Sequence, residues 1–287
     1  MKDIIYEFLD YILLERKYSD FTETSYELDL FKYEEYLNDH KINYLKVNYN
    51  NISDFIIYLK KSGYKSTSIN RMLSTLRSFY KYLEKNKKII NNPFSMVSSL
   101  KTEKRLPNYF KYDEFNKMID TLDDSSLDIR NRLILEMLLA TGLRVSELAN
   151  IKINDIDYLN QEIKVMGKGS KERIVFFNNH SLIAINKYLE NRGFNNDYLV
   201  LNNKGKEITV RGIELIIKNV IDKACLKVHV SPHTFRHTFA THMLSNGCPL
   251  KSVQELLGHA SLSSTEIYTH ITDDYIKSEY LKNMPRR

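Results

Sequence analysis

The sequence of 287 residues predicts a mainly α-helical protein with two domains, the second of which carries a small antiparallel β-sheet. Apolar residues recur at helical spacing through residues 1–97. Residues 98–107 lose that period and gain lysine, arginine and proline, which is typical of an interdomain linker. In residues 108–287 helical periods continue, except around 162–177, where the period becomes two.

The N-terminal domain is predicted to consist of helices, expected over residues 4–18, 19–40, 51–63 and 66–88. The last of them is almost free of acidic residues, with Glu84 the exception. Its basic side chains can lie along one exposed side: Arg71, Arg77, Lys81 and Lys85. A strip of one charge is what contact with a phosphate backbone needs. An ordinary solvated face explains the pattern equally well.

The C-terminal domain is predicted to be mostly helical. Helices are expected over residues 111–122, 128–151, 181–192, 209–225, 231–244, 250–258 and 263–271. The segment 128–151 is apolar enough to be buried. Alternating residues in 162–177 predict two short strands around the turn "GKGS", whose residues suit a hairpin. This hairpin is the predicted β-sheet.

The composition favours a nucleic-acid partner. The formal charge of +6 and the pI near 9.0 favour an anionic partner, and no basic amphipathic anchor points to a membrane instead. No apolar run reaches the roughly 18–20 residues that span a bilayer. The two cysteines, Cys225 and Cys248, form neither a disulfide framework nor a CxxC metal pair. A reducing, cytoplasmic location is therefore expected.

Two candidate cations lie in the stretches "ATGLRVSEL" and "GKGSKER". Arg144 follows a glycine in an apolar stretch, and a buried arginine is costly unless it is paired or awaits an anion. Glu147, three residues later on the same helical face, could simply neutralise it. Lys168 at the hairpin tip can swing into a site as a proton donor or phosphate ligand, although most such lysines are only solvated.

The stretch "SPHTFRHTFATHML", residues 231–244, places polar groups at a helix start. Ser231 suits the N-cap and a proline follows it. His233 and Arg236 then lie three residues apart, where free amides and the helix dipole also attract an anion such as phosphate. His233 and His237 have a zinc-chelating spacing, but the glutamate of HExxH and a completing ligand are missing, so no metal site is predicted.

A fourth stretch, "ELLGHASLSSTEIYTHI", contains two further polar candidates. Gly258 ends a helix, His259 follows it, and Tyr268 comes nine residues later. Each is a weak signal by itself. Together the four stretches suit phosphodiester cleavage by a side-chain nucleophile, which needs cations, a proton acceptor and a proton donor. A tyrosine, whose ordinary pKa is near 10, attacks well only beside positive charge or a base. No metal or other cofactor is required.

The ordered set of polar residues in these stretches resembles the catalytic set of the tyrosine recombinases, the lambda-integrase family. The matching residues are Arg144, Lys168, His233, Arg236, His259 and Tyr268, within "TGLRVSEL", "GKGSKER", "PHTFRHTFATHML" and "LGHASLSSTEIYTH". The N-terminal helical region is similar to the family's core-binding domain. The ending "YTHITDDYIKSEYLKNMPRR" looks most like the Xer subgroup, the chromosome-dimer resolvases.

The resemblance implies a two-domain clamp on duplex DNA and a site-specific recombinase. Tyr268 would attack the scissile phosphate to give a 3′-phosphotyrosine and a free 5′-hydroxyl, and Lys168 would protonate the leaving oxygen. The two arginines would hold the phosphate, aided by the two histidines, with Glu147 in support.

The resemblance also implies an assembly. Four protomers, of one or two kinds, would exchange strands between two DNA sites through a Holliday junction, and a DNA translocase would be an activating partner. The C-terminal helix, in residues 273–283, would dock into a neighbouring protomer. Three alternatives stay open: an integrase of a phage or mobile element, a type IB topoisomerase, and a non-catalytic DNA-binding protein.

Overall fold

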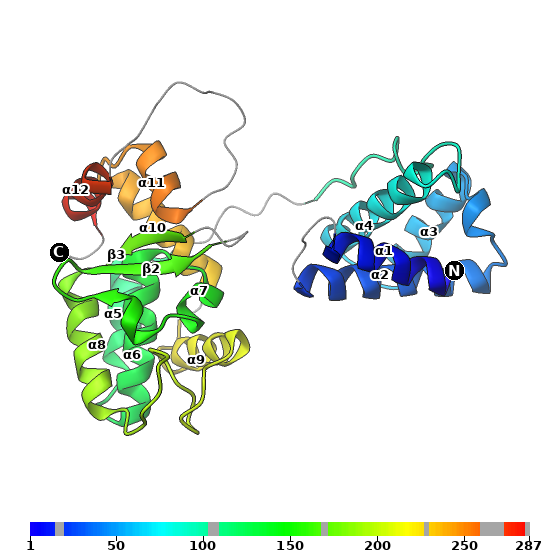
Figure 1. The fold of residues 1–287 in the computed structure, drawn as a ribbon. Helices are drawn as coiled ribbons and strands as arrows, with labels where there is room; N and C mark the ends of the chain where they lie inside the picture. Colours follow the sequence, from blue (N-terminus) through cyan, green and yellow to red (C-terminus); the bar gives the residue numbers. More distant parts are fainter. Residues whose placement is uncertain (15–19, 103–108, 168–171, 227–229, 259–272, 285–287) are drawn as a thin grey trace. The chain divides into compact units, whose positions relative to one another are not determined.

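The structure is a computed structural model that describes residues 1–14, 20–102, 109–167, 172–226, 230–258 and 273–284. The chain divides into two compact units, Met1–Arg105 and Leu106–Arg287 (Figure 1). The division falls inside the segment 98–107, whose role as a linker stays a prediction. Most of the described chain is helical and the second unit holds one small antiparallel sheet, which confirms the predicted fold class. None of the helices described is long and apolar enough to cross a membrane.

The first unit consists of helices. They are α1 (Lys2–Leu14), α2 (Asp20–Asp39), α3 (Tyr49–Lys61) and α4 (Ser66–Lys85), with a short 3-10 helix at Tyr44–Lys46. Its core contains many aromatic rings: Phe8, for example, meets Phe79 edge-on at 5.4 Å between ring centroids. The apolar face of α4 is buried, as the helical spacing predicts. Burial of that face is the main force holding α4 to the unit.

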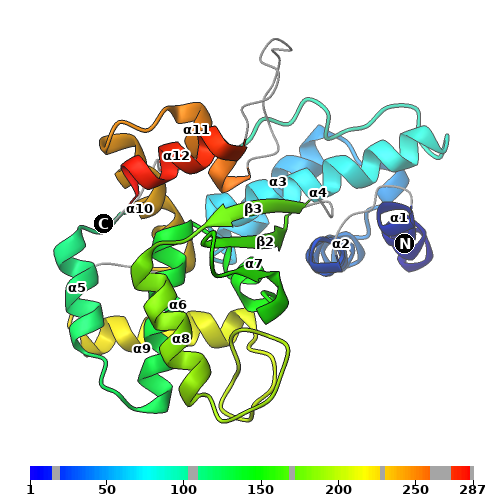
Figure 2. The same ribbon diagram turned by 60° about the vertical axis from the view of Figure 1, so that its left-hand side comes forward.

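The second unit carries the remaining elements of the chain. Its helices are α5 (Tyr112–Asp120), α6 (Ser126–Thr141), α7 (Val145–Ala149), α8 (Asn179–Asn191), α9 (Val210–Lys223), α10 (Pro232–Ser245), α11 (Leu250–Leu257) and α12 (Asp273–Asn283), with a 3-10 turn at Ile153–Asp155. Helix α6 lies against both α8 and α10, so it forms the centre of the unit (Figures 1 and 2). This arrangement buries most residues of α6, as its apolar sequence predicts.

The sheet has three antiparallel strands in the order β1-β2-β3. They are β1 (Ile156–Asp157), β2 (Glu162–Met166) and β3 (Glu172–Phe176). The pair β2 and β3 is the predicted hairpin, whereas the two-residue β1 is too short to leave a periodic signal. Val165 pairs with Arg173, and Ile163 pairs with Val175. Alternation therefore places Arg173 on the same face as these buried apolar residues.

The single helix predicted over 128–151 is wrong, because the chain breaks at Gly142. This residue has φ +61° and closes α6, with its amide donating to the carbonyl of Leu138. The Thr141 hydroxyl donates to the Met137 carbonyl and accepts from the amide of Leu143, which stabilises the turn. A Cβ at Gly142 would come within 2.6 Å of the Phe239 ring. Position 142 therefore needs glycine, both for its left-handed backbone and because a side chain would collide with the Phe239 ring.

Helix α12 packs against its own unit in this single chain. Ile276 and Tyr280 are buried in a cluster with Phe176 and Phe239, and the Tyr280 hydroxyl donates to the carbonyl of Ala140 at 3.0 Å. Figure 2 shows α12 lying beside α11. Docking of α12 into a neighbouring protomer, which the resemblance implies, stays a prediction.

Candidate active site

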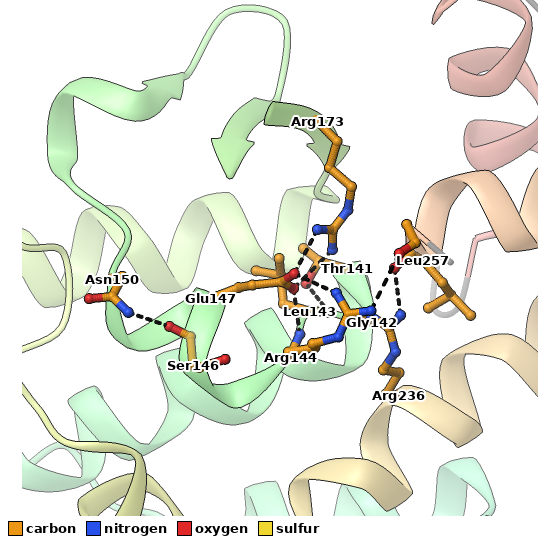
Figure 3. A network of polar contacts seen from close by, with 11 residues as sticks. Thr141, Gly142, Leu143, Arg144, Ser146, Glu147, Asn150, Arg173, Arg236 and Leu257 are labelled. Atoms are coloured by element: carbon orange, nitrogen blue, oxygen red, sulfur yellow. Dashed lines mark hydrogen bonds and ion pairs between the residues drawn. The ribbon is translucent and has the colours of Figure 1, made fainter. Parts of the chain in front are cut away.

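The candidate site lies where α7, β3, α10 and the end of α11 meet. Figure 3 shows Arg144, Arg173 and Arg236 converging on one region, with Glu147 among them. Among the residues labelled there, Glu147 is the one acidic side chain. The site therefore holds more positive than negative charge.

Glu147 is a buried carboxylate held by two arginines. Arg173 forms a fork across it, with its two terminal nitrogens donating to Oε1 at 2.6 Å and to Oε2 at 2.9 Å. Arg144 donates from its side chain to Oε1 and from its backbone amide to Oε2, both at 2.8 Å. Burial raises the pKa of the Glu147 carboxyl, but the hydrogen bonds from the two arginines and the charge of Arg173 outweigh burial and hold this pKa below its usual range.

Arg144 stands at the N-cap of α7, directly after the turn at Gly142. Its backbone is extended, and Glu147 caps the helix by accepting from the Arg144 amide. The second terminal nitrogen of the guanidinium donates to the carbonyl of Gly258 at 3.3 Å. The side chain stays one-third exposed, at 33%. Pairing with Glu147 therefore does not seal Arg144 away from an incoming anion.

Arg236 is buried, and backbone carbonyls hold it. Its two terminal nitrogens donate to the carbonyls of Gly142, at 2.7 Å, and Leu257. These carbonyls end α6 and α11, where the helix dipole makes the oxygen atoms strong acceptors. Burial first, and then the charge of Arg144, lower the pKa of Arg236 to about 10. This value leaves the guanidinium charged at neutral pH.

The glycine that ends α11 allows Arg173 to lie close to the backbone. Gly258 has φ +64°, and a Cβ there would lie 2.8 Å from Cδ and 2.9 Å from Nε of Arg173. Its carbonyl also accepts from Arg144. Gly258 thus joins the arginine network at the point where the chain continues to the predicted site residue His259.

Comparisons with known proteins agree with the motifs. Residues 108–274 match the phage integrase family, and residues 5–87 match the phage integrase N-terminal SAM-like domain. A relative from Listeria innocua serovar 6a, named tyrosine recombinase XerC, is 42% identical over 97% of this chain and 96% of its own length. The chain belongs to the tyrosine recombinases of the phage integrase family. The predicted recognition, and the prediction of a recombinase enzyme of Xer type, are thereby confirmed.

Solved structures of other recombinases share the fold. The XerH site-specific recombinase bound to palindromic difH substrate is 26% identical, with a TM-score of 0.73 over 86% of this chain and 75% of that chain. A lambda integrase dimer bound to a COC′ core site is 18% identical, with a TM-score of 0.74 over 93% and 99% of the two chains. The likeness to lambda integrase shows a shared fold.

The structure describes three of the six residues in the predicted catalytic set. Arg144 and Arg236 meet through the ends of α6 and α11, as described above. His233 lies exposed in the first turn of α10, which begins at the predicted Ser231 cap, whereas the buried Arg236 donates its hydrogen bonds to the carbonyls of Gly142 and Leu257. The other three lie outside the described residues: Lys168, His259 and Tyr268. Within the described ranges, no three His, Cys, Asp or Glu side chains form a group that could hold a metal ion.

Sequence reasoning missed Arg173, although the sequence contained a signal for it. In "ERIVF" the arginine alternates with Val175, and Val175 is buried. An arginine on the inward side of a strand needs a carboxylate partner. The partner, Glu147, lies 26 residues earlier, so only the folded chain identifies it.

The four basic residues predicted to contact DNA in α4 have different surroundings. Arg71 is half-exposed and pairs with the buried Asp29 at 2.7 Å. Arg77 donates to backbone carbonyls of the segment after α4, which fastens that segment to the helix. Lys81 and Lys85 are exposed, and the Lys85 ammonium also lies 4.9 Å from the centroid of an aromatic ring. Contact of these residues with DNA stays a prediction.

Proposed function

We propose that this recombinase cuts and rejoins DNA at specific sites through a tyrosine nucleophile. The observation that carries the proposal is the cluster of Arg144, Arg173 and Arg236 around the single carboxylate of Glu147. Three arginines and one glutamate carry a net charge of +2. Such an excess suits a phosphodiester, which gains negative charge on its non-bridging oxygens as it is attacked.

Arg144 and Arg236 would hold the scissile phosphate. Arg236 keeps its full charge because neutral backbone carbonyls hold it, and Arg144 is one-third exposed. Guanidinium groups bind phosphate oxygens in a fork, so two of them could reach both non-bridging oxygens. His233 and His259 would add hydrogen bonds to the same phosphate.

Tyr268 would attack the phosphorus, and Lys168 would act as the general acid. The tyrosine hydroxyl gives its proton to an acceptor as its oxygen bonds to phosphorus. The bond from phosphorus to the 5′ oxygen breaks, and Lys168 gives its proton to that departing oxygen. The products are a 3′-phosphotyrosine and a free 5′-hydroxyl. Because the phosphotyrosine link conserves the energy of the broken phosphodiester bond, rejoining needs no ATP, and we propose no cofactor.

Both units would bind duplex DNA, with residues 98–107 as the linker between them. In the N-terminal unit the contacts would come from Arg71, Arg77, Lys81 and Lys85, which would bind phosphates. Affinity would then fall steeply as salt concentration rises, because phosphate contacts release counterions.

The biological role that we propose is resolution of chromosome dimers in the cytoplasm. Four protomers, of this chain alone or with a paralogue, would act on two sites through a Holliday junction, with a DNA translocase as activator. Two findings support the role: the 42% identity to a protein named tyrosine recombinase XerC over nearly the whole chain, and the likeness to XerH bound to difH substrate.

A two-site recombination assay tests the proposal. The DNA bound in cells would first be mapped, and two copies of the bound sequence would then be placed in one plasmid. We expect binding near the chromosome terminus and conversion of the plasmid into two circles by wild type but not by Tyr268→Phe. Binding at the ends of a mobile element would contradict the chromosomal role. Relaxation of supercoils without exchange would indicate a topoisomerase, and activity unchanged by Tyr268→Phe would contradict the mechanism.

A further inference from the structure

Arg173 touches both of the chain segments that hold Arg144. Its guanidinium forms the fork on Glu147, and its Cδ and Nε lie 2.8 and 2.9 Å from where a Cβ of Gly258 would be. Arg144 donates to the same two partners, the Glu147 carboxylate and the Gly258 carbonyl. The two arginines therefore share one set of supports, although they come from different elements, β3 and the start of α7 (Figure 3).

The two arginines do not share the Glu147 carboxylate equally. Arg173 is the more buried, with 14% of its side chain exposed against 33% for Arg144. It also donates twice to the carboxylate, whereas the Arg144 guanidinium donates once. A forked, buried ion pair is the stronger of the two arrangements. Most of the negative charge of Glu147 is thus balanced by Arg173.

We propose that Arg173 is a positioning residue for the cleavage reaction. Its guanidinium fixes and neutralises Glu147, so that Arg144 keeps both its orientation and its positive charge for the scissile phosphate. The inference rests on the proposed function, because it assumes that Arg144 binds this phosphate. Without Arg173, the Glu147 carboxylate would pair with Arg144 alone, and the pair would have no net charge to offer.

A neutral phosphate analogue separates this role from a merely structural one. A methylphosphonate at the scissile position replaces one non-bridging oxygen with a methyl group and removes the negative charge. A variant that has lost positive charge at that oxygen should then lose less activity. A variant whose fold is disturbed should lose as much on the analogue as on phosphate.

The experiment measures single-turnover cleavage of nicked DNA substrates by the full chain. Each stereoisomer of the methylphosphonate is compared with natural phosphate. Arg173→Met should slow cleavage of phosphate by about 10–100-fold, the usual effect of losing a residue that orients a functional group. On the stereoisomer that rescues Arg144→Ala, the loss should fall below about threefold. Arg173→Lys, which keeps the charge but not the fork, should lie between Arg173→Met and wild type.

Arg192 offers the matched control. It is partly buried in the same unit and donates to the carbonyls of Asn196 and Tyr198, away from the Glu147 network. Arg192→Met should lower the melting temperature without changing the ratio of the rates on the two substrates. Melting curves and DNA affinity are measured for every variant. If Arg173→Met does not fold, the rates on phosphate and methylphosphonate are compared for Arg173→Lys instead.

Three outcomes would overturn the inference. Equal losses on phosphate and on both stereoisomers would make Arg173 a structural residue only. Rescue of Arg173→Met by a bridging sulfur, which leaves without a proton donor, would place its effect on the Lys168 step instead. Absence of cleavage by wild type on every substrate would contradict the proposed function itself, and the inference with it.

Discussion

At the scale of the residue, the site depends on backbone carbonyls as much as on charged side chains. Arg236 is held by the last carbonyls of two helices, and a third carbonyl, that of Gly258, accepts from Arg144. Neutral acceptors orient a guanidinium without cancelling its charge. The two glycines that end α6 and α11, Gly142 and Gly258, therefore help to position the arginines.

Gly258→Ala should slow cleavage and destabilise the fold. A left-handed backbone costs an alanine about 1–2 kcal/mol, and the new Cβ would also press on Arg173, 2.8 Å away. Gly193→Ala is the matched control, because Gly193 has φ +66° with nothing within 4 Å of the added Cβ. Chemical denaturation should show a similar backbone cost in both variants, whereas only Gly258→Ala should lose cleavage rate, by about tenfold or more. Equal cleavage rates in the two variants would contradict a role for the Arg173 contact.

At the scale of the element, most helices and the hairpin could be predicted from apolar periodicity, because burial imposes it. The break at Gly142 could not, since the apolar run continues through it and only a left-handed φ and the nearby Phe239 ring demand the glycine. Arg144 and Arg236 could be assigned to one site from their motifs. Their meeting through helix-end carbonyls, and the partnership of Glu147 with Arg173, depend on long-range packing that local sequence does not encode.

Helix α12 should contribute to the stability of the second unit as well as to any docking. Tyr280→Ala removes a ring that is 1% exposed together with its hydrogen bond to Ala140, and should cost about 3–5 kcal/mol. Leu281→Ala, one residue later and 44% exposed, should change the free energy of unfolding by no more than about 0.5 kcal/mol. Urea denaturation measures both. A cost for Tyr280→Ala no larger than that of Leu281→Ala would mean that α12 does not pack on its own unit in solution.

At the scale of the whole molecule, the protein combines a helical N-terminal unit with a C-terminal unit that carries the arginine cluster. The two family matches together extend over both units. We propose that both units bind DNA and that the C-terminal unit also cleaves and rejoins the strands. The overall charge of +6 favours association with DNA of any sequence. Specificity must then come from contacts to base edges.

The central claim is that a tyrosine of this chain becomes covalently bonded to the 3′ side of a cut DNA strand. A nicked suicide substrate tests it most directly, because the short fragment released by cleavage diffuses away and traps the intermediate. The account predicts a covalent protein–DNA adduct for wild type, located at Tyr268 by mass spectrometry of the digested complex, and none for Tyr268→Phe. An adduct on the 5′ side, at another residue, or unchanged in Tyr268→Phe would contradict the account.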